Sequence, residues 1–343
     1  MPYSFDPYTL VRPFLHSLDP ERAHELALWA LERGIVAPRS LTPDPILAST
    51  FLGWALPHPL GLAAGFDKNA RVAPRMFGQG FSFVEVGGVT LLPQIGNPRP
   101  RVFRLPAERA VINRMGLPND GAEVVAARLR ERPAPGMLGV NIASNAMSRD
   151  PVGDFARLVE RFAPLCAFIS LDLSCPNTEN GQIFLEPARL EELLTRLTGA
   201  YVLIIAKLSP DIEDARLAEL VDVLLRGKIA AICMGNTTTS HPYGERGGLS
   251  GAPLSPLSTR KLATVCRLVG KRLPLIGTGG ICSGADAYEK IRAGASVLQL
   301  YTAMIYEGPG VVGRILRELA EFLRRGGFTS LGEAVGSGVD GGS

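Results

Sequence analysis

Eight short apolar runs alternate with amphipathic stretches along most of the chain. The runs occupy residues 59–65, 81–88, 137–142, 168–174, 202–209, 230–236, 273–280 and 296–302. Helical apolar spacing separates most of them, at residues 154–165, 187–199, 213–226, 258–269 and 284–293. Each run is apolar on both faces, which is typical of parallel strands covered by helices. Strand–helix alternation repeated eight times predicts an α/β fold, a (β/α)8 TIM barrel.

The first 45 residues have a different pattern. One helical stripe, weakened by Pro13, carries Leu10, Val11, Phe14, Leu15 and Leu18. A second helix is predicted between a cap at Asp19 and a stop at Gly34. We therefore predict a helical segment at residues 1–45 and a barrel at residues 46–343. The helices either simply pack on the barrel or form an apolar lid that rests on a membrane.

One connection between predicted strands is unusually long. Residues 91–119 are rich in Pro and Arg and show no helical period. Within them, 101–105 and 110–113 are typical of a small hairpin over the barrel. Long insertions of this kind often form a lid or a binding loop.

Composition excludes several classes of protein. The net charge of +3 and the lack of a dense Lys/Arg run argue against nucleic-acid binding. Five cysteines without a CxxC pattern indicate a reducing compartment. Four histidines without metal-ligand spacing predict no metal site. The sequence contains no run of about 18 apolar residues, so we expect no membrane-spanning helix. We also expect no secretory signal.

Polar residues and glycines gather where the predicted strands end, and in such barrels that edge carries the active site. Lys207 lies inside an apolar run and needs a partner there, because a buried unpaired charge is costly. The strand ends supply Lys68, Asn69, Gly87, Gly88, Thr90, Asn141, Asn145, Asp172, Cys175, Asn177, Asn236, Thr237, Thr238, Gly279, Gly280, Tyr301 and Thr302. Together they predict a binding site at this rim.

A phosphate-bearing flavin suits this rim. The Gly-rich loops at 246–251 and 277–280, with Tyr301 and Thr302, occupy the positions where barrels commonly bind phosphate. Lys207 can stabilise negative charge on a reduced ring, which favours FMN as the cofactor. Nearby lysines lower the pKa of a thiol, so Cys175 can serve as a general base. The alternative is that Cys175 is a small buried residue, as we assume for Cys166, Cys233 and Cys266.

Seven segments together resemble the dihydroorotate dehydrogenase family over nearly the whole chain. They are AAGFDKN, NRMGLPN, SCPNT, GNTT, GGLSG, GTGGI and GASVLQLYT. The N-terminal LDPERAHELAL is similar to the quinone-using class 2 members. The resemblance implies FMN-dependent oxidation of dihydroorotate to orotate in pyrimidine biosynthesis, with quinone as the electron acceptor. It also implies peripheral association with the cytoplasmic side of the cell membrane, with the N-terminal helices forming the quinone entrance.

The resemblance also assigns site residues. The base falls on Cys175. The residues that it places around FMN are Ala64, Gly65, Lys68, Gly88, Asn141, Asp172, Lys207, Gly251, Gly280, Tyr301 and Thr302. Those around the substrate are Lys68, Asn113, Arg114, Met115, Gly116, Leu117, Asp172, Asn177, Asn236 and Thr237.

The chain departs from the family pattern at several positions. Class 2 members usually carry Ser where this chain has Cys175, a base that looks like class 1. Asp172 replaces a usual Asn, Gly88 and Gly235 replace Thr, and Ser144 replaces Lys. Strand alternation predicts that Asp172 faces the barrel mouth near Lys68 or Lys207, where pairing would keep it ionised.

Two alternatives remain open at this point. The substitutions leave room for a paralogous FMN oxidoreductase that acts on another cyclic amide or enoate. A non-catalytic flavin- or membrane-binding protein is the second alternative, and the presence of both Lys68 and Cys175 argues against it.

Overall fold

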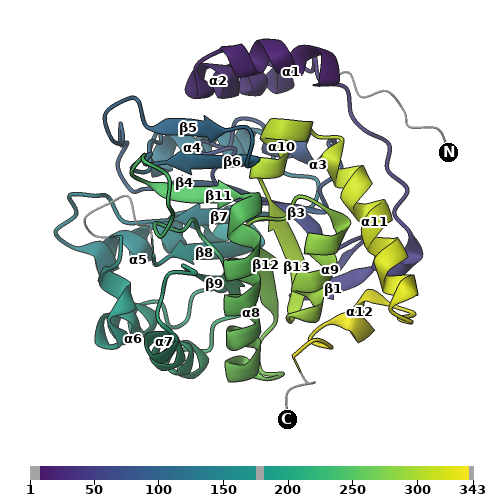
Figure 1. Cartoon of the computed structure of the whole chain (residues 1–343). Coiled ribbons are helices and arrows are strands. Elements are labelled where there is room, and N and C mark those ends of the chain that lie inside the picture. The colour runs from purple at the N-terminus through teal and green to yellow at the C-terminus, as the bar shows by residue number, and fades with distance from the viewer. Residues whose placement is uncertain (1–7, 175–180, 340–343) are drawn as a thin grey trace.

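Eight parallel strands close into a barrel in the computed structural model, which describes residues 8–174 and 181–339 (Figure 1). Around the barrel they are β3 (Leu60–Leu62), β4 (Phe83–Val89), β7 (Met137–Ile142), β8 (Phe168–Asp172), β9 (Leu203–Leu208), β10 (Ala231–Met234), β12 (Leu275–Thr278) and β13 (Ala295–Leu300). Each strand lies within or overlaps one of the eight apolar runs. The predicted (β/α)8 barrel is therefore confirmed.

Helices cover the outside of the barrel. The longer ones are α4 (Ala122–Glu131), α5 (Pro151–Phe162), α6 (Pro187–Arg196), α7 (Asp214–Arg226), α8 (Ser255–Val269), α9 (Gly284–Arg292) and α11 (Val311–Arg325). The shorter ones are α3 (Ala73–Phe77), α10 (Thr302–Glu307) and α12 (Leu331–Ala334). All five segments with predicted helical spacing are helices. Helix α5 begins earlier than its apolar pattern suggested, because Asp150 caps it by accepting a hydrogen bond from Gly153 N.

An aromatic plug fills the end of the barrel opposite the predicted site. The antiparallel pair β1 (Ser49–Phe51) and β2 (Trp54–Leu56) brings Phe51 into a stack on Phe83, at the first residue of β4. Gly61 and Gly139 leave room for the rings of Phe83 and Phe168, since a Cβ at either glycine would lie within 2.5 Å of ring atoms. Side chains therefore fill this end of the barrel, and the cavity opens at the carboxyl ends of the strands.

A small antiparallel sheet lies over the barrel mouth. The predicted hairpin is confirmed as β5 (Val102–Leu105) and β6 (Ala110–Asn113). A third strand, β11 (Gly248–Gly251), pairs with β6 and was not predicted. Its glycine-rich sequence gives no β pattern, and the sheet forms because the hairpin supplies a partner edge.

Two N-terminal helices, α1 (Tyr8–Ser17) and α2 (Pro20–Glu32), lie beyond this sheet and α10 (Figure 1). Asp19 caps α2 as predicted, accepting hydrogen bonds from Glu21 N and Arg22 N at 3.1 Å. Pro13 lies inside α1 without ending it. Among residues 8–174 and 181–339, no helix combines the length and the apolar character that a membrane crossing requires.

Candidate functional site

A single cavity of about 870 Å³ runs from the barrel mouth to α1 and α2. Most of the predicted site residues line it: Ala64, Gly65, Lys68, Gly88, Asn113, Met115, Gly116, Leu117, Asn141, Asp172, Lys207, Asn236, Thr237, Gly251, Gly280, Tyr301 and Thr302. The structure thus brings together residues from both the predicted cofactor set and the predicted substrate set.

Three predicted residues are not placed in this cavity. The Arg114 side chain is directed elsewhere: it lies over the Phe103 ring and donates to Pro100 O at 2.8 Å and Arg246 O at 3.1 Å. Cys175 and Asn177 lie outside the described residues, so their predicted roles rest on the sequence. Ser174, the last described residue before them, is buried.

Asp172 and Lys207 stand side by side at the mouth. They are register partners on β8 and β9, whereas the strand alternation predicted only that Asp172 faces the mouth near Lys68 or Lys207. Asn236 donates its amide to Asp172 Oδ1 at 3.2 Å. Burial raises the pKa of Asp172, and Lys207 acts against that rise. The proximity to a lysine is as predicted, but burial opposes the ionised state that the sequence had suggested.

A buried carboxylate lies deeper in the barrel, below these residues. Glu85 of β4 accepts hydrogen bonds from Asn141 Nδ2 at 2.9 Å and from Gln299 Nε2 at 2.5 Å. Both amides are therefore fixed in orientation. Sequence analysis missed Glu85 and Gln299, although each is a polar residue inside an apolar run, the same signal that singled out Lys207.

Lys68 reaches the cavity from the loop after β3. Its ammonium donates to Gly65 O at 2.7 Å. Burial lowers the pKa of Lys68 to about 8, while the carboxylate of Glu21 on α2 acts in the opposite direction. Lys68 is thus mostly a cation at neutral pH, and it can hold an anionic group at the mouth.

The glycine-rich rim forms a narrow cradle. At Gly280 the backbone has φ +80° and a Cβ would lie 2.4 Å from Ser255 N, so only glycine fits between the loop and α8. Across the rim, Thr302 donates from Oγ1 to Ser250 Oγ at 3.0 Å. The buried Thr237 Oγ1 has no hydrogen-bond partner among the described residues. A close backbone approach and an unpartnered hydroxyl fit a flavin phosphate and a polar substrate, respectively.

The other end of the cavity is apolar and partly aromatic. His24 of α2 meets the Phe66 ring edge-on at 5.2 Å and lies 6.4 Å from the Tyr301 ring. Burial, with help from Lys68, lowers the pKa of His24 to about 3, so its imidazole is neutral. Val11, Phe14 and other side chains of α1 and α2 continue the lining toward the protein surface. This end can admit an apolar, uncharged molecule.

Ion pairs join α2 to the barrel loops. Glu21 pairs with Arg101 at 2.8 Å and with Arg99 at 3.0 Å. Toward the other end of the helix, Arg71 binds Glu32 at 2.9 Å and Glu25 at 2.7 Å. The helix is therefore held at both ends across the apolar opening.

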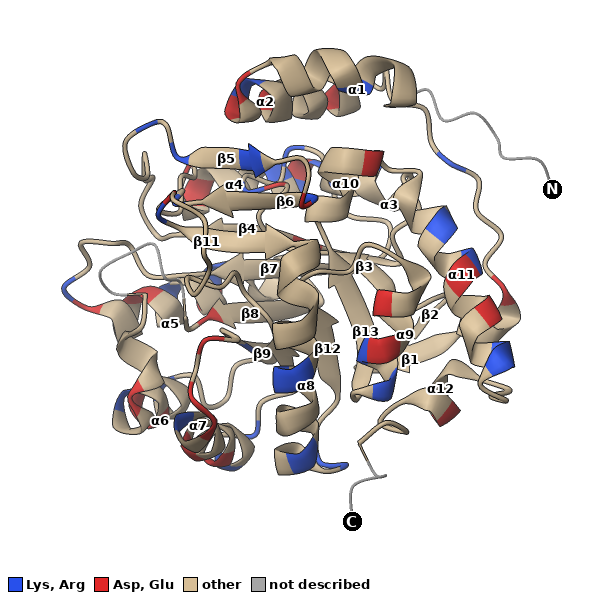
Figure 2. Ribbon diagram, viewed as in Figure 1, with Lys and Arg blue, Asp and Glu red and all other residues tan. Residues whose placement is uncertain are grey.

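Helix α1 is docked mainly through backbone carbonyls. His16 Nε2 lies 2.9 Å from Ile305 O, and Arg12 donates to Tyr306 O at 3.2 Å. Arg104 of β5 donates to Leu15 O at 3.0 Å, which complements the negative end of α1. Figure 2 shows charged residues along the outer helices α6, α7 and α11, whereas α1 is mostly uncharged.

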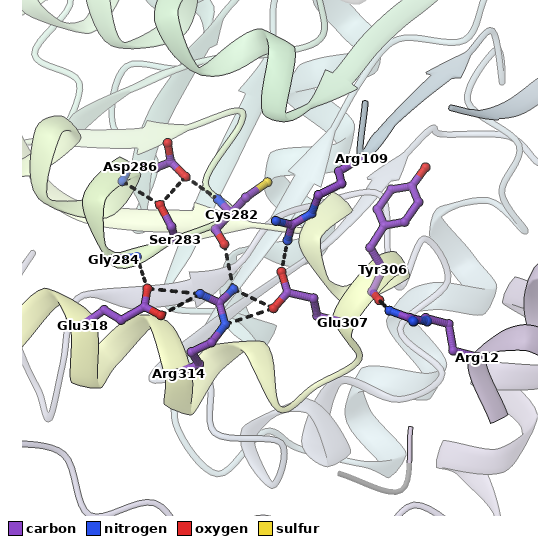
Figure 3. Close-up of polar contacts among 10 residues, drawn as sticks. All are labelled: Arg12, Arg109, Cys282, Ser283, Gly284, Asp286, Tyr306, Glu307, Arg314 and Glu318. Carbon is purple, nitrogen blue, oxygen red and sulfur yellow. Dashed lines mark hydrogen bonds and ion pairs between the residues drawn. The ribbon is translucent and has the colours of Figure 1, made fainter. Parts of the chain in front are cut away.

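An ionic network supports the rim below α1 (Figure 3). Glu307 of α10 binds both Arg109, from the β5–β6 turn, and Arg314 of α11. Arg314 also donates to Cys282 O at 2.7 Å and pairs with Glu318 at 2.8 Å. The hairpin, α10, α11 and the loop after β12 are thereby held in one arrangement around the cavity.

Comparisons with known proteins agree with this geometry. The family model described as "Dihydroorotate dehydrogenase" matches residues 46–323. A protein of Rhodospirillum rubrum named "Dihydroorotate dehydrogenase (quinone)" is 45% identical, covering 97% of this chain and 95% of its own. One of the same name from Parvibaculum lavamentivorans is 44% identical, covering 98% and 99%. The crystal structure of Eimeria tenella DHODH in complex with ferulenol is similar at a TM-score of 0.89 and 33% identity, over 95% of this chain and 96% of that one.

Proposed function

The chain belongs to the dihydroorotate dehydrogenase family, in its quinone-dependent class 2 group, and on this premise we propose how its residues work. It oxidises dihydroorotate to orotate in pyrimidine biosynthesis and passes the electrons to a quinone. The observation that carries the residue-level proposal is the single cavity. It joins a polar mouth, a glycine-rich cradle and an apolar opening, one environment for each of substrate, cofactor and acceptor.

The cradle and the mouth would hold FMN. Gly280, Tyr301 and Thr302 would surround its phosphate, while Asn141 and Lys207 would face its ring. When bound, FMN supplies the two-electron chemistry that links substrate to acceptor. Lys207 would provide a positive charge beside the ring where negative charge develops, and Glu85 keeps the Asn141 amide in one orientation.

The substrate would lie between the mouth residues and the loop at 113–117. Its carboxylate would lie toward Asn113, Asn177 and Asn236, and Lys68 and Thr237 would line the rest of the substrate site. Cys175 would remove the proton from the substrate carbon. Asp172 contacts Asn236 and would accept hydrogen bonds from ring N–H groups when ionised, or donate one when protonated.

The apolar opening would admit the quinone between α1 and α2. Leu10 and Phe14 are 71% and 58% exposed, and neither faces the barrel core. Such side chains suit an interface of lipid and water. We therefore assign residues 1–45 to quinone access and peripheral attachment at the cytoplasmic face of the cell membrane, and residues 46–343 to the FMN-binding barrel.

Anaerobic mixing with dihydroorotate tests this proposal. Protein loaded with FMN should lose its flavin absorbance on mixing and recover it when a quinone is added. An FMN-loaded protein that dihydroorotate leaves oxidised would overturn the proposal. Bleaching by a different cyclic amide or enoate would instead identify the paralogous oxidoreductase.

A further inference from the structure

Lys290 of α9 is a buried lysine that does not itself line the cavity. Its side chain is 0% exposed, and its ammonium donates to Ser258 Oγ at 2.6 Å and to Thr259 Oγ1 at 3.1 Å. Both of these partners, on α8, are neutral hydroxyls. Among the described residues no carboxylate forms an ion pair with Lys290. A buried ammonium without a countercharge is costly, so the position calls for a compensating anion.

Ser258 connects Lys290 to the glycine-rich rim. Its oxygen accepts from the Lys290 ammonium, and its single proton is shared between Gly279 O at 2.9 Å and Ser255 O, in its own helix, at 3.1 Å. The following residue, Gly280, packs directly against the backbone of Ser255 at the start of α8. The ammonium, the hydroxyl and the loop at 279–280 thus form one continuous chain of contacts.

We propose that Lys290 is a positioning residue for the phosphate of the cofactor: through Ser258 it fixes the loop at 279–280 and places a positive charge behind it. The inference rests on the proposed function, because it takes that loop as the FMN phosphate site. It accounts for a fully buried lysine between α8 and α9. If the residue served only to connect the two helices, a neutral hydroxyl or amide side chain could form the same hydrogen bonds.

The charge on Lys290 is coupled to its surroundings. Burial lowers the pKa of Lys290 to about 7, and Asp286 on the same helix acts against that shift. The described contacts from α8 are the uncharged Ser258 and Thr259. A phosphate bound at the loop would favour the protonated form and raise the pKa. Phosphate affinity should therefore fall as the pH rises and Lys290 loses its proton.

The test compares FMN with riboflavin, which has the same ring and no phosphate. Dissociation constants for the full-length, flavin-stripped protein are measured by quenching of flavin fluorescence. Lys290→Met should bind FMN about tenfold or more weakly, the scale expected for losing one nearby charge, and riboflavin as before. Ser258→Ala should show a smaller selective loss. Lys271→Met, which removes an exposed lysine, is the matched control and should change neither constant.

The pH dependence gives a second measurement. A phosphate monoester has its second pKa at about 6, so the series is run above neutral pH, where that group no longer titrates. The preference for FMN over riboflavin should decline with pH in the wild type and stay flat in Lys290→Met.

Each outcome decides between the assignments. Equal losses of FMN and riboflavin affinity in Lys290→Met would make Lys290 a structural tie only and overturn the inference. If Lys290→Met does not fold, an unchanged FMN preference in Ser258→Ala overturns it instead. A wild-type protein that binds neither flavin would refute the proposed function itself, a result distinct from both.

Discussion

Replacing Glu21 by Gln should release α2 from the barrel. The Glu21 side chain is 14% exposed and that of Arg101 is 6% exposed, so this pair is largely removed from water. Arg101 also donates to Ile95 O and Asn97 O, which hold its guanidinium in place whether or not Glu21 is charged. The substitution leaves a buried cation facing a neutral amide. Breaking such a pair costs about 3–5 kcal/mol.

That penalty is comparable with the free energy that the other contacts of α2 contribute to its docking. Leu28 and Leu31 are the buried apolar residues of α2, and full burial of a leucine is worth about 1.5–3 kcal/mol. The Arg71 pairs are more exposed, and exposed pairs contribute about 0–1 kcal/mol each. Docking of α2 in Glu21→Gln should therefore be close to balanced, with a large undocked population.

The two half-reactions report on this release separately. Steady-state turnover should show kcat/KM for quinone reduced by about twofold or more, because a balanced equilibrium leaves about half of the molecules with α2 docked. Stopped-flow flavin reduction by dihydroorotate should change much less. Because Glu21 also supports the charge on Lys68, this step is measured well below the Lys68 pKa of about 8. Limited proteolysis should cleave residues 8–34 faster in Glu21→Gln than in the wild type.

Glu25→Gln is the matched control. It removes a carboxylate from the same helix, but Glu25 is 63% exposed and its partner Arg71 keeps Glu32. This variant should behave like the wild type in both assays. If Glu21→Gln loses no more quinone turnover than Glu25→Gln, the buried pair does not hold the helix and the reasoning is refuted.

Three further predictions concern the mouth and the membrane face. Cys175→Ala should slow flavin reduction by about 10²–10⁴-fold, the range for loss of a general base, with Cys175→Ser in between; wild-type rates in Cys175→Ala would exclude Cys175 as the base. Orotate binding should weaken with rising pH in the wild type as Asp172, whose pKa burial raises, ionises and repels the anion. Asp172→Asn should bind orotate more tightly and lose the part of that pH dependence that lies below the Lys68 pKa of about 8, and identical binding curves for the two proteins would contradict this role. Phe14→Glu should reduce sedimentation with phospholipid vesicles while leaving flavin reduction intact, whereas undiminished sedimentation would argue against an α1 contact with lipid.

Most of the barrel could be predicted because its information is local. Each strand is an apolar run a few residues long, and each helix repeats its own spacing. The residues at the rim could be predicted from the barrel topology, because the carboxyl ends of parallel strands converge at one edge. Strand β11 was missed because its GLSG sequence has no β preference, and it exists only through pairing with β6.

What the sequence could not supply were pairings between distant segments. Glu85 meets Asn141 and Gln299 across the barrel interior, and no spacing along the chain reveals that contact. The sequence also could not show how strongly burial shifts the pKa of a side chain. The sequence suggested an ionised Asp172 beside a lysine, but the balance between Lys207 and burial depends on the folded environment.

The contacts of Glu21 join the two ends of the cavity physically. The same carboxylate binds Arg101, which docks α2, and raises the pKa of Lys68 at the mouth. Undocking α2 removes that carboxylate from the neighbourhood of Lys68, so the Lys68 ammonium loses its largest electrostatic support while its own burial also changes. The state of the lid at the apolar end therefore bears on the charge available to an anionic substrate at the polar end. On the proposed function, α2 would thus serve both half-reactions, through the contacts that its acidic residues make with the barrel loops.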